Sequence, residues 1–145
     1  MHEIYQVLTE LESLSAARAA ELDYSSEDLA ALAQTVTDMD TALAHEDRKA
    51  WAQADEAFHN ELVRLGGNSR IAGIVENFND QVRRARALTL KVRPMPHKSS
   101  KDHAALFDAI ARGDSKAAHQ IHWDHRDGAR KLLTDLLEQL GLKHF

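Results

Sequence analysis

Four residues that can bind a metal ion occupy helical positions where apolar side chains are expected: Asp55, His59, His103 and His125. Burying such a group without a partner is costly, so four of them in one small protein call for a shared partner. Asp55 and His59 are four residues apart, which places both on one face of a helix. Three imidazoles and one carboxylate, without sulfur, suit Zn, Ni, Mn or Fe(II). The pattern therefore favours one divalent metal ion, with Zn as the first expectation.

Each of these residues also has an ordinary explanation when it is taken alone. A histidine on an apolar helix face is more often a hydrogen-bonded core residue than a metal ligand, and a core aspartate often makes a hydrogen bond between helices. His122, three residues before His125, lies on the same broad helix face and competes with it as a ligand. Spacing alone leaves the metal site and the structural alternative open.

The spacing of apolar residues predicts an all-α protein of about six helices, in a single domain that covers residues 1–145. The first helix is expected over His2 to about Glu21, with an apolar stripe that includes Val7 and Leu14. The later helices are expected to begin near Ser25, Asp47, Asn68, Ser99 and Asp114. Asp28 and Asp102 lie three residues after the two serines, the spacing of a capping box. Such an arrangement can bring side chains from three helices to one point, as metal sites in helix bundles require.

Composition excludes several classes of protein. The formal net charge is −5, whereas a nucleic-acid-binding module usually has a basic face, so this chain alone is not expected to bind DNA. There is no apolar run of about 18 residues, which argues against a membrane span. With no cysteine there is neither a disulfide framework nor a thiolate metal site. We therefore expect a cytoplasmic protein that has no membrane partner.

Residues 55–62 read D-x-x-F-H-x-x-L, and residues 102–114 contain the segment D-H…A-I…G-D. Both match signatures of one family, with Asp102 for the usual Glu in the second. The chain resembles the FCD domain, the C-terminal effector-binding and dimerisation domain of FadR-subfamily GntR transcription regulators. His125 follows His103 at the position of the family's last histidine, and Ile4–Val7 with Leu11-Glu12 resembles the opening helix. His122 stands where the family usually has an apolar residue.

The resemblance implies an antiparallel helical bundle and a divalent metal held by Asp55, His59, His103 and His125. It also implies a small carboxylate effector bound at that metal, and a homodimer. The basic stretch near residue 85 supplies candidates for an effector contact, with Arg86 first and Arg83 second. The winged helix-turn-helix domain of the family has no counterpart in this chain, so contact with DNA is expected only through a domain outside it.

Two functions are compatible with these features. The first is a non-enzymatic sensor domain of a GntR-type transcriptional regulator. The alternative is a small metal-dependent hydrolase or lyase that uses open metal positions. An enzyme of that kind needs a general base beside the metal. Neither Glu56 nor Glu61 is well placed for it in the sequence, so the sensor is the favoured interpretation.

Overall fold

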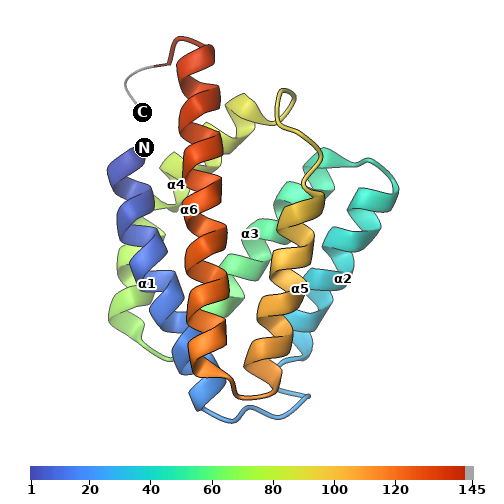
Figure 1. Ribbon diagram of the computed structural model, residues 1–145, viewed down its shortest axis with the longest axis vertical. Coiled ribbons are helices and arrows are strands. Elements are labelled where there is room, and N and C mark those ends of the chain that lie inside the picture. The colour runs from blue at the N-terminus through green and yellow to red at the C-terminus, as the bar shows by residue number, and fades with distance from the viewer. Residues whose placement is uncertain (143–145) are drawn as a thin grey trace.

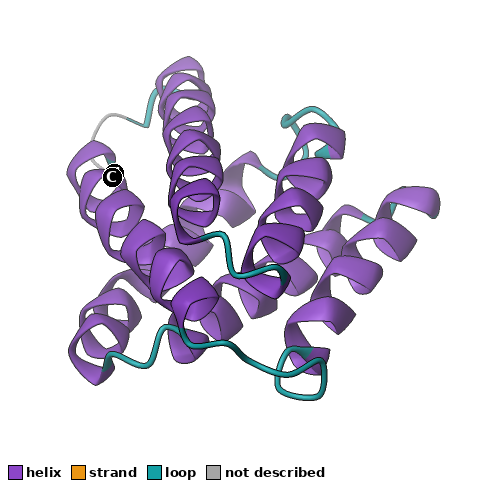
Figure 2. Ribbon diagram, turned by 60° about the horizontal axis from the view of Figure 1, so that its bottom comes forward, coloured by secondary structure: helices purple, strands orange, loops and turns teal. Residues whose placement is uncertain are grey.

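The computed structural model describes residues 1–142, which form six α-helices joined by short connections (Figures 1 and 2). The helices are α1 (His2–Glu21), α2 (Ala30–Ala44), α3 (Arg48–Leu65), α4 (Ser69–Thr89), α5 (His97–Ala111) and α6 (Ser115–Gln139). Successive helices run in opposite directions, and α1 lies alongside α6 (Figure 1). The predicted all-α antiparallel bundle is confirmed. No helix within the described residues is long and apolar enough to cross a membrane.

Side-chain caps begin three helices where the sequence predicts them. The carboxylate of Asp47 accepts a hydrogen bond from the Ala50 amide, and that of Asp114 accepts one from the Ala117 amide. The Asn68 side chain accepts from the amides of Arg70 and Ile71. These contacts satisfy backbone donors that the first turn of a helix leaves free.

Two predicted helix starts are wrong. Ser25 and Asp28 do form the reciprocal capping contacts, but residues 26–29 are a turn and regular helix begins only at Ala30. In contrast, α5 begins at His97, directly after Pro96 and two residues before the predicted Ser99. Asp102 does not cap this helix, because its carboxylate contacts Lys98 and His125 instead.

The buried face of α1 also differs from the expected stripe. Val7 and Leu14 are 40% and 44% exposed, whereas Tyr5 and Glu12, which lie outside the expected stripe, are almost completely buried. The apolar residues of α1 surround most of the helix, so periodicity alone gave its inward face imprecisely. A charged residue, Glu12, consequently points into the bundle.

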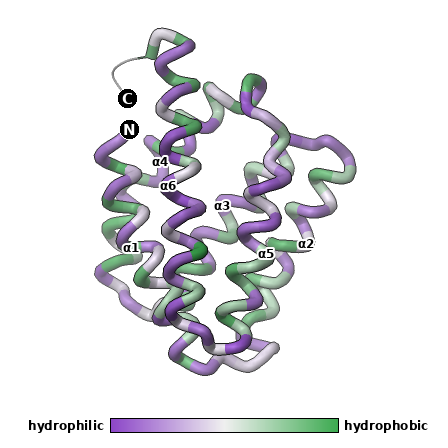
Figure 3. The backbone as a smooth tube through the Cα atoms, viewed as in Figure 1, coloured by the Kyte–Doolittle hydropathy of each residue, from purple (hydrophilic) through white to green (hydrophobic). Residues whose placement is uncertain are grey.

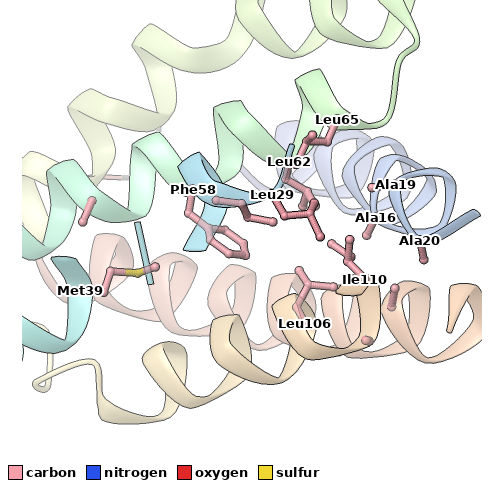
Figure 4. Close-up of a cluster of buried hydrophobic side chains, with 14 of the residues drawn as sticks. Ala16, Ala19, Ala20, Leu29, Met39, Phe58, Leu62, Leu65, Leu106 and Ile110 are labelled. Carbon is pink, nitrogen blue, oxygen red and sulfur yellow. The ribbon is translucent and has the colours of Figure 1, made fainter. Parts of the chain in front are cut away.

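Apolar side chains form two buried clusters, and the tube in Figure 3 shows where hydrophobic residues recur along each helix. The larger cluster joins the C-terminal half of α1 to α2, α3 and α5, around Phe58, Leu62 and Leu106 (Figure 4). The smaller one joins the N-terminal half of α1 to α4 and the C-terminal half of α6, including Leu8 and Leu133.

A layer of polar residues separates the two clusters. Along α1, Glu12 lies between Leu8 of the smaller cluster and Ala16 of the larger one. Along α6, residues 122–126 lie between Ala118 and Leu133, which belong to different clusters. The apolar clusters on either side thus hold this buried polar layer in place and keep bulk water away from it.

Candidate metal centre

The four predicted ligands converge in this polar layer from α3, α5 and α6. All four are buried, with exposed fractions of 7% or less. Asp55 Oδ1 is 3.2 Å from His59 Nε2 and 3.0 Å from His103 Nε2. The two Nε2 atoms are 3.3 Å apart. His125 brings a ring nitrogen within 4.8 Å of ring nitrogens of both other histidines.

A hydrogen-bond acceptor holds the Nδ1 atom of each of these histidines. His59 Nδ1 is 3.0 Å from Glu12 Oε1, and His125 Nδ1 is 3.1 Å from Asp102 Oδ2. His103 Nδ1 is 2.5 Å from the carbonyl oxygen of Ser99. Because ionised carboxylates and carbonyls only accept hydrogen bonds, Nδ1 is the donor in all three rings. In a neutral imidazole the other nitrogen, Nε2, then carries the lone pair.

The arrangement therefore collects acceptors around one point. Nε2 of His59, Nε2 of His103 and Oδ1 of Asp55 are mutually 3.0–3.3 Å apart. Ligands about 2.1 Å from one ion at tetrahedral angles would be roughly 3.4 Å apart, which is close to these separations. Three acceptors this near to one another repel unless a cation lies among them. These three ligand atoms fit a divalent ion.

Burial and charged neighbours keep Asp55 and His125 in the forms that bind metal. Burial alone would raise the pKa of Asp55, but the charge of Arg86 is the largest opposing effect, and that pKa lies well below its ordinary value. Burial lowers the pKa of His125 to about 3, although its contact with Asp102 acts in the opposite direction. At neutral pH, Asp55 is a carboxylate and His125 a neutral imidazole, as metal binding requires.

A second group of potential ligands adjoins the first and shares His59. Glu12, His59 and His122 present ligand atoms within 4.8 Å of one another, and all three are buried. Arg126 forms an ion pair with Glu12, so a cation already occupies one side of this carboxylate. His122 is only 1% exposed, and its Nε2 has no hydrogen-bond partner within residues 1–142. Burial holds the pKa of His122 well below its ordinary value.

The family model of the FCD domain matches residues 3–128. This chain belongs to the FCD domain family. It is also 34% identical over 71 residues to an uncharacterised HTH-type transcriptional regulator in an unstable DNA locus of Streptomyces ambofaciens. The matched segment covers 49% of this chain and 30% of that regulator. The chain is thus an all-helical FCD domain, and its likeness to the curated relative covers less than a third of that protein's length.

The two arginines that the sequence singles out in this FCD domain lie in different environments. Arg86 points inward, where Nη1 is 2.8 Å from Asp55 Oδ2. Burial would lower the pKa of Arg86, but Tyr5 and Asp55 raise it above its ordinary value, so the guanidinium stays charged. Arg83 is 57% exposed in its side chain and pairs with Glu56 and Asp80. Only Arg86 touches one of the four expected ligands.

Sequence reasoning assigned no role to Glu12, Arg126 or Arg93 in the FCD domain. Glu12 is one turn from the buried Leu8 and Ala16, and this spacing was the available signal. Arg126 is four residues after His122, on the same face of α6. Arg93 lies in a loop, where periodicity gives no information.

Proposed function

We propose that this FCD domain is the metal-containing, organic-acid-sensing domain of a GntR-type transcriptional regulator, and that it is not an enzyme. The observation that carries the proposal is the convergence of Nε2 of His59 and His103 on Asp55 Oδ1, with Nδ1 of His59, His103 and His125 each committed to another acceptor. Such a set of lone pairs is built for a cation. We assign Asp55, His59, His103 and His125 as its ligands.

A divalent ion bound there, with Zn first and Ni, Mn or Fe(II) as alternatives, would supply a positive charge that favours an anionic effector. The protein adds Arg86, whose guanidinium lies on the outer oxygen of Asp55. When Asp55 ligates the ion, the ion balances the negative charge of its carboxylate. The guanidinium of Arg86 then becomes available to a carboxylate of the effector. A charge-assisted contact of this kind is typically worth ~1.5–3 kcal/mol. Arg83 is the second candidate for this contact.

The likeness to a HTH-type regulator supports the regulatory half of the proposal. DNA would be contacted by a separate DNA-binding domain, and two FCD domains would pair as a homodimer. The net charge of −5 is consistent with a domain that does not itself attach to DNA. In a gel shift at about 0.15 M salt, this chain alone should form no sequence-specific complex.

The enzyme alternative needs a general base beside the metal, and each glutamate considered for that role is already paired. Glu56, next to Asp55 in the sequence, pairs with Arg83 on the surface. Glu61 pairs with Arg64. Glu12 is wholly buried, and its carboxylate contacts both His59 and Arg126. We therefore expect binding of acids without turnover when metal-loaded protein is incubated with esters, lactones and phosphates.

The metal assignment is tested by elemental analysis after reconstitution and removal of free metal. The wild type should hold one equivalent, and His103→Ala should hold far less. His119→Ala is the matched control, because His119 lies on α6 outside the cluster. Retention of a full equivalent by His103→Ala would disprove the assignment. A loss in His122→Ala but not in His125→Ala would move the fourth ligand to His122.

The effector assignment is tested by calorimetric titration of metal-loaded and metal-free protein with hydroxycarboxylates and dicarboxylates. Binding should require metal and should weaken in Arg86→Gln, whereas Arg83→Gln should bind as the wild type does. Equal affinity of the loaded and metal-free forms would exclude ligation of the effector by the ion.

A further inference from the structure

Two cavities meet at the connection between α4 and α5, the yellow segment before α5 in Figure 1. The smaller one, about 20 Å³, is bordered by Asp55 and Arg86 of the metal centre. The larger one, about 220 Å³, reaches His125 from the other side. Arg93, Pro94 and Pro96 line both. This segment is therefore the wall that the two cavities share, and both approach the candidate metal centre.

Arg93 places an uncompensated positive charge in that wall. Its side chain is partly buried, and within residues 1–142 its guanidinium makes no hydrogen bond or ion pair. Its backbone is fixed, since Arg48 Nη1 donates to the Arg93 carbonyl oxygen at 2.5 Å. Burial and the neighbouring Arg86 lower the pKa of Arg93. A partly buried guanidinium beside a second one is stabilised by an anion, and no carboxylate within residues 1–142 pairs with Arg93.

The smaller cavity has an excess of positive charge. Arg48, Arg86 and Arg93 line it, and Asp55 is its acidic residue. Asp55 already contacts His59 and His103. The positive charge of the arginines that Asp55 does not balance is therefore available to an external anion that contacts Arg93.

Gly128 leaves the larger cavity open. It lies within α6, where a glycine weakens a helix relative to alanine. Neither backbone nor packing requires it, because an added Cβ would meet no atom within 4 Å and its φ is not in the left-handed region. The missing side chain deepens the cavity, whose charged and titratable lining residues are Arg93, Lys98, Asp102 and His125. The Asp102 carboxylate is already paired with Lys98 and His125, which leaves Arg93 as the unpaired charge of this cavity.

We propose that the larger cavity is the binding site of the acidic effector, that Arg93 anchors its carboxylate, and that Gly128 sets the size of acid that fits. This inference rests on the proposed function and adds the place and size class of the ligand. A volume of 220 Å³ corresponds to roughly seven water molecules, which suits a small carboxylic or hydroxycarboxylic acid. An acid held there lies between the guanidinium of Arg93 and the imidazole of His125. A second carboxylate of the same acid would reach Arg86, which lines only the smaller cavity, across the shared wall.

The test is calorimetric titration of metal-loaded protein with acetate, lactate, malate and citrate as probes. Arg93→Gln should weaken the tightest of these by ~10- to 100-fold, because a charge-assisted contact is lost. Arg93→Lys keeps the charge without the forked donors and should recover only part of the affinity. Arg84→Gln removes the same charge from the exposed side of α4 and should bind as the wild type does.

Gly128→Leu gives the sharper result. A leucine favours the helix, so the melting temperature should equal or exceed that of the wild type, while acid binding falls by tenfold or more and metal content stays at one equivalent. Gly73→Leu is the matched control, since Gly73 is an exposed helical glycine with open space around it. Gly128→Ala, a smaller change, should weaken the largest acid that binds the wild type before the smaller ones.

The outcomes separate the two proposals. Wild-type affinity in both Arg93→Gln and Gly128→Leu would overturn this inference and leave the proposed function standing. If none of the four acids binds the wild type, the proposed function itself is contradicted. If Gly128→Leu does not fold, Gly128→Ala decides, and unchanged affinity for every acid in that variant would also overturn the inference.

Discussion

Two buried carboxylate–arginine pairs flank His59, and they have different surroundings. Asp55 pairs with Arg86 on the Nε2 side of the ring, and Glu12 pairs with Arg126 on the Nδ1 side. Asp55 and Arg86 line a cavity beside Arg93. Glu12 is 0% exposed, and Arg126 is 3% exposed and stacks over the ring of Tyr5. The same chemistry thus occurs once in an accessible setting and once in a closed one.

This difference indicates a division of labour. Ionised groups removed from water need compensation from their partners, and the Glu12 carboxylate has its partners, His59 and Arg126, within the protein. Its contact with His59 fixes that ring so that Nε2 faces Asp55. The Asp55 pair borders a cavity of about 20 Å³, space for about one water molecule, which shares a wall with the larger cavity. It is therefore the half in which we expect partners to be exchanged. We therefore expect changes at Glu12 to alter the stability of the metal-free protein, and to affect metal binding only through the orientation of His59. Changes at Asp55 should act on binding directly.

The largest expected effect is on the closed half. Glu12→Ala leaves Arg126 buried without its carboxylate and should lower the free energy of unfolding by about 3–5 kcal/mol, measured by urea titration of metal-free protein. Replacing both partners by leucine should recover most of this loss, because no unpaired charge remains. A loss in Glu12→Ala below about 1 kcal/mol would contradict the assignment of Glu12 and Arg126 as a buried structural pair.

Removal of metal should have the next largest effect. An ion that binds only the folded state, at a thousandfold excess over its Kd, stabilises the protein by about 4 kcal/mol. Chelation at pH 7.5 should therefore lower the melting temperature of the wild type. Chelation should leave the melting temperature of Asp55→Asn unchanged, because that variant lacks a ligand. The variant Glu12→Gln should still bind metal, with an affinity about 10- to 100-fold weaker than that of the wild type. A wild-type melting temperature that does not respond to chelator would favour a purely structural polar layer.

Stability of the metal-free protein should fall as the pH is lowered from about 6.5. Burial lowers the pKa of His125 to about 3 and that of His122 well below its ordinary value. Below pH ~6.5 the unfolded chain takes up protons that the folded protein excludes, so each histidine costs about 1 kcal/mol for each further pH unit. Urea titrations at pH 7.5 and 5.5 measure this loss, and His122→Leu should show a smaller one.

The smallest effect is expected on the surface of α4. Arg83→Gln removes an exposed ion pair with Glu56 and should change neither the urea midpoint nor the affinity for acids. Arg86→Gln, one turn further along the same helix, should weaken acid binding by ~10-fold or more. If Arg83→Gln and Arg86→Gln bound acids with equal affinity, the Asp55–Arg86 pair would not differ in function from the surface pair of Arg83 with Glu56.

Much of the fold could be predicted because local rules were sufficient. Apolar periodicity gave the six helices, and Asp47, Asn68 and Asp114 gave three of their starts. The start of α5 was missed because Ser99 and Asp102 resemble a cap, whereas Asp102 in fact contacts His125. A capping signal and a carboxylate that orients a histidine look identical in sequence.

The sequence by itself determined which side chains could meet in the polar layer, since Asp55, His59, His103 and His125 stand out against their apolar neighbours. The tertiary structure decided which polar residues join them. Glu12 and Arg126 belong to α1 and α6, more than a hundred residues apart in the chain, and only the packing of these helices makes them partners. It also decided that Arg86 faces inward and Arg83 outward, because the rotation of α4 against α3 depends on contacts that no local pattern records.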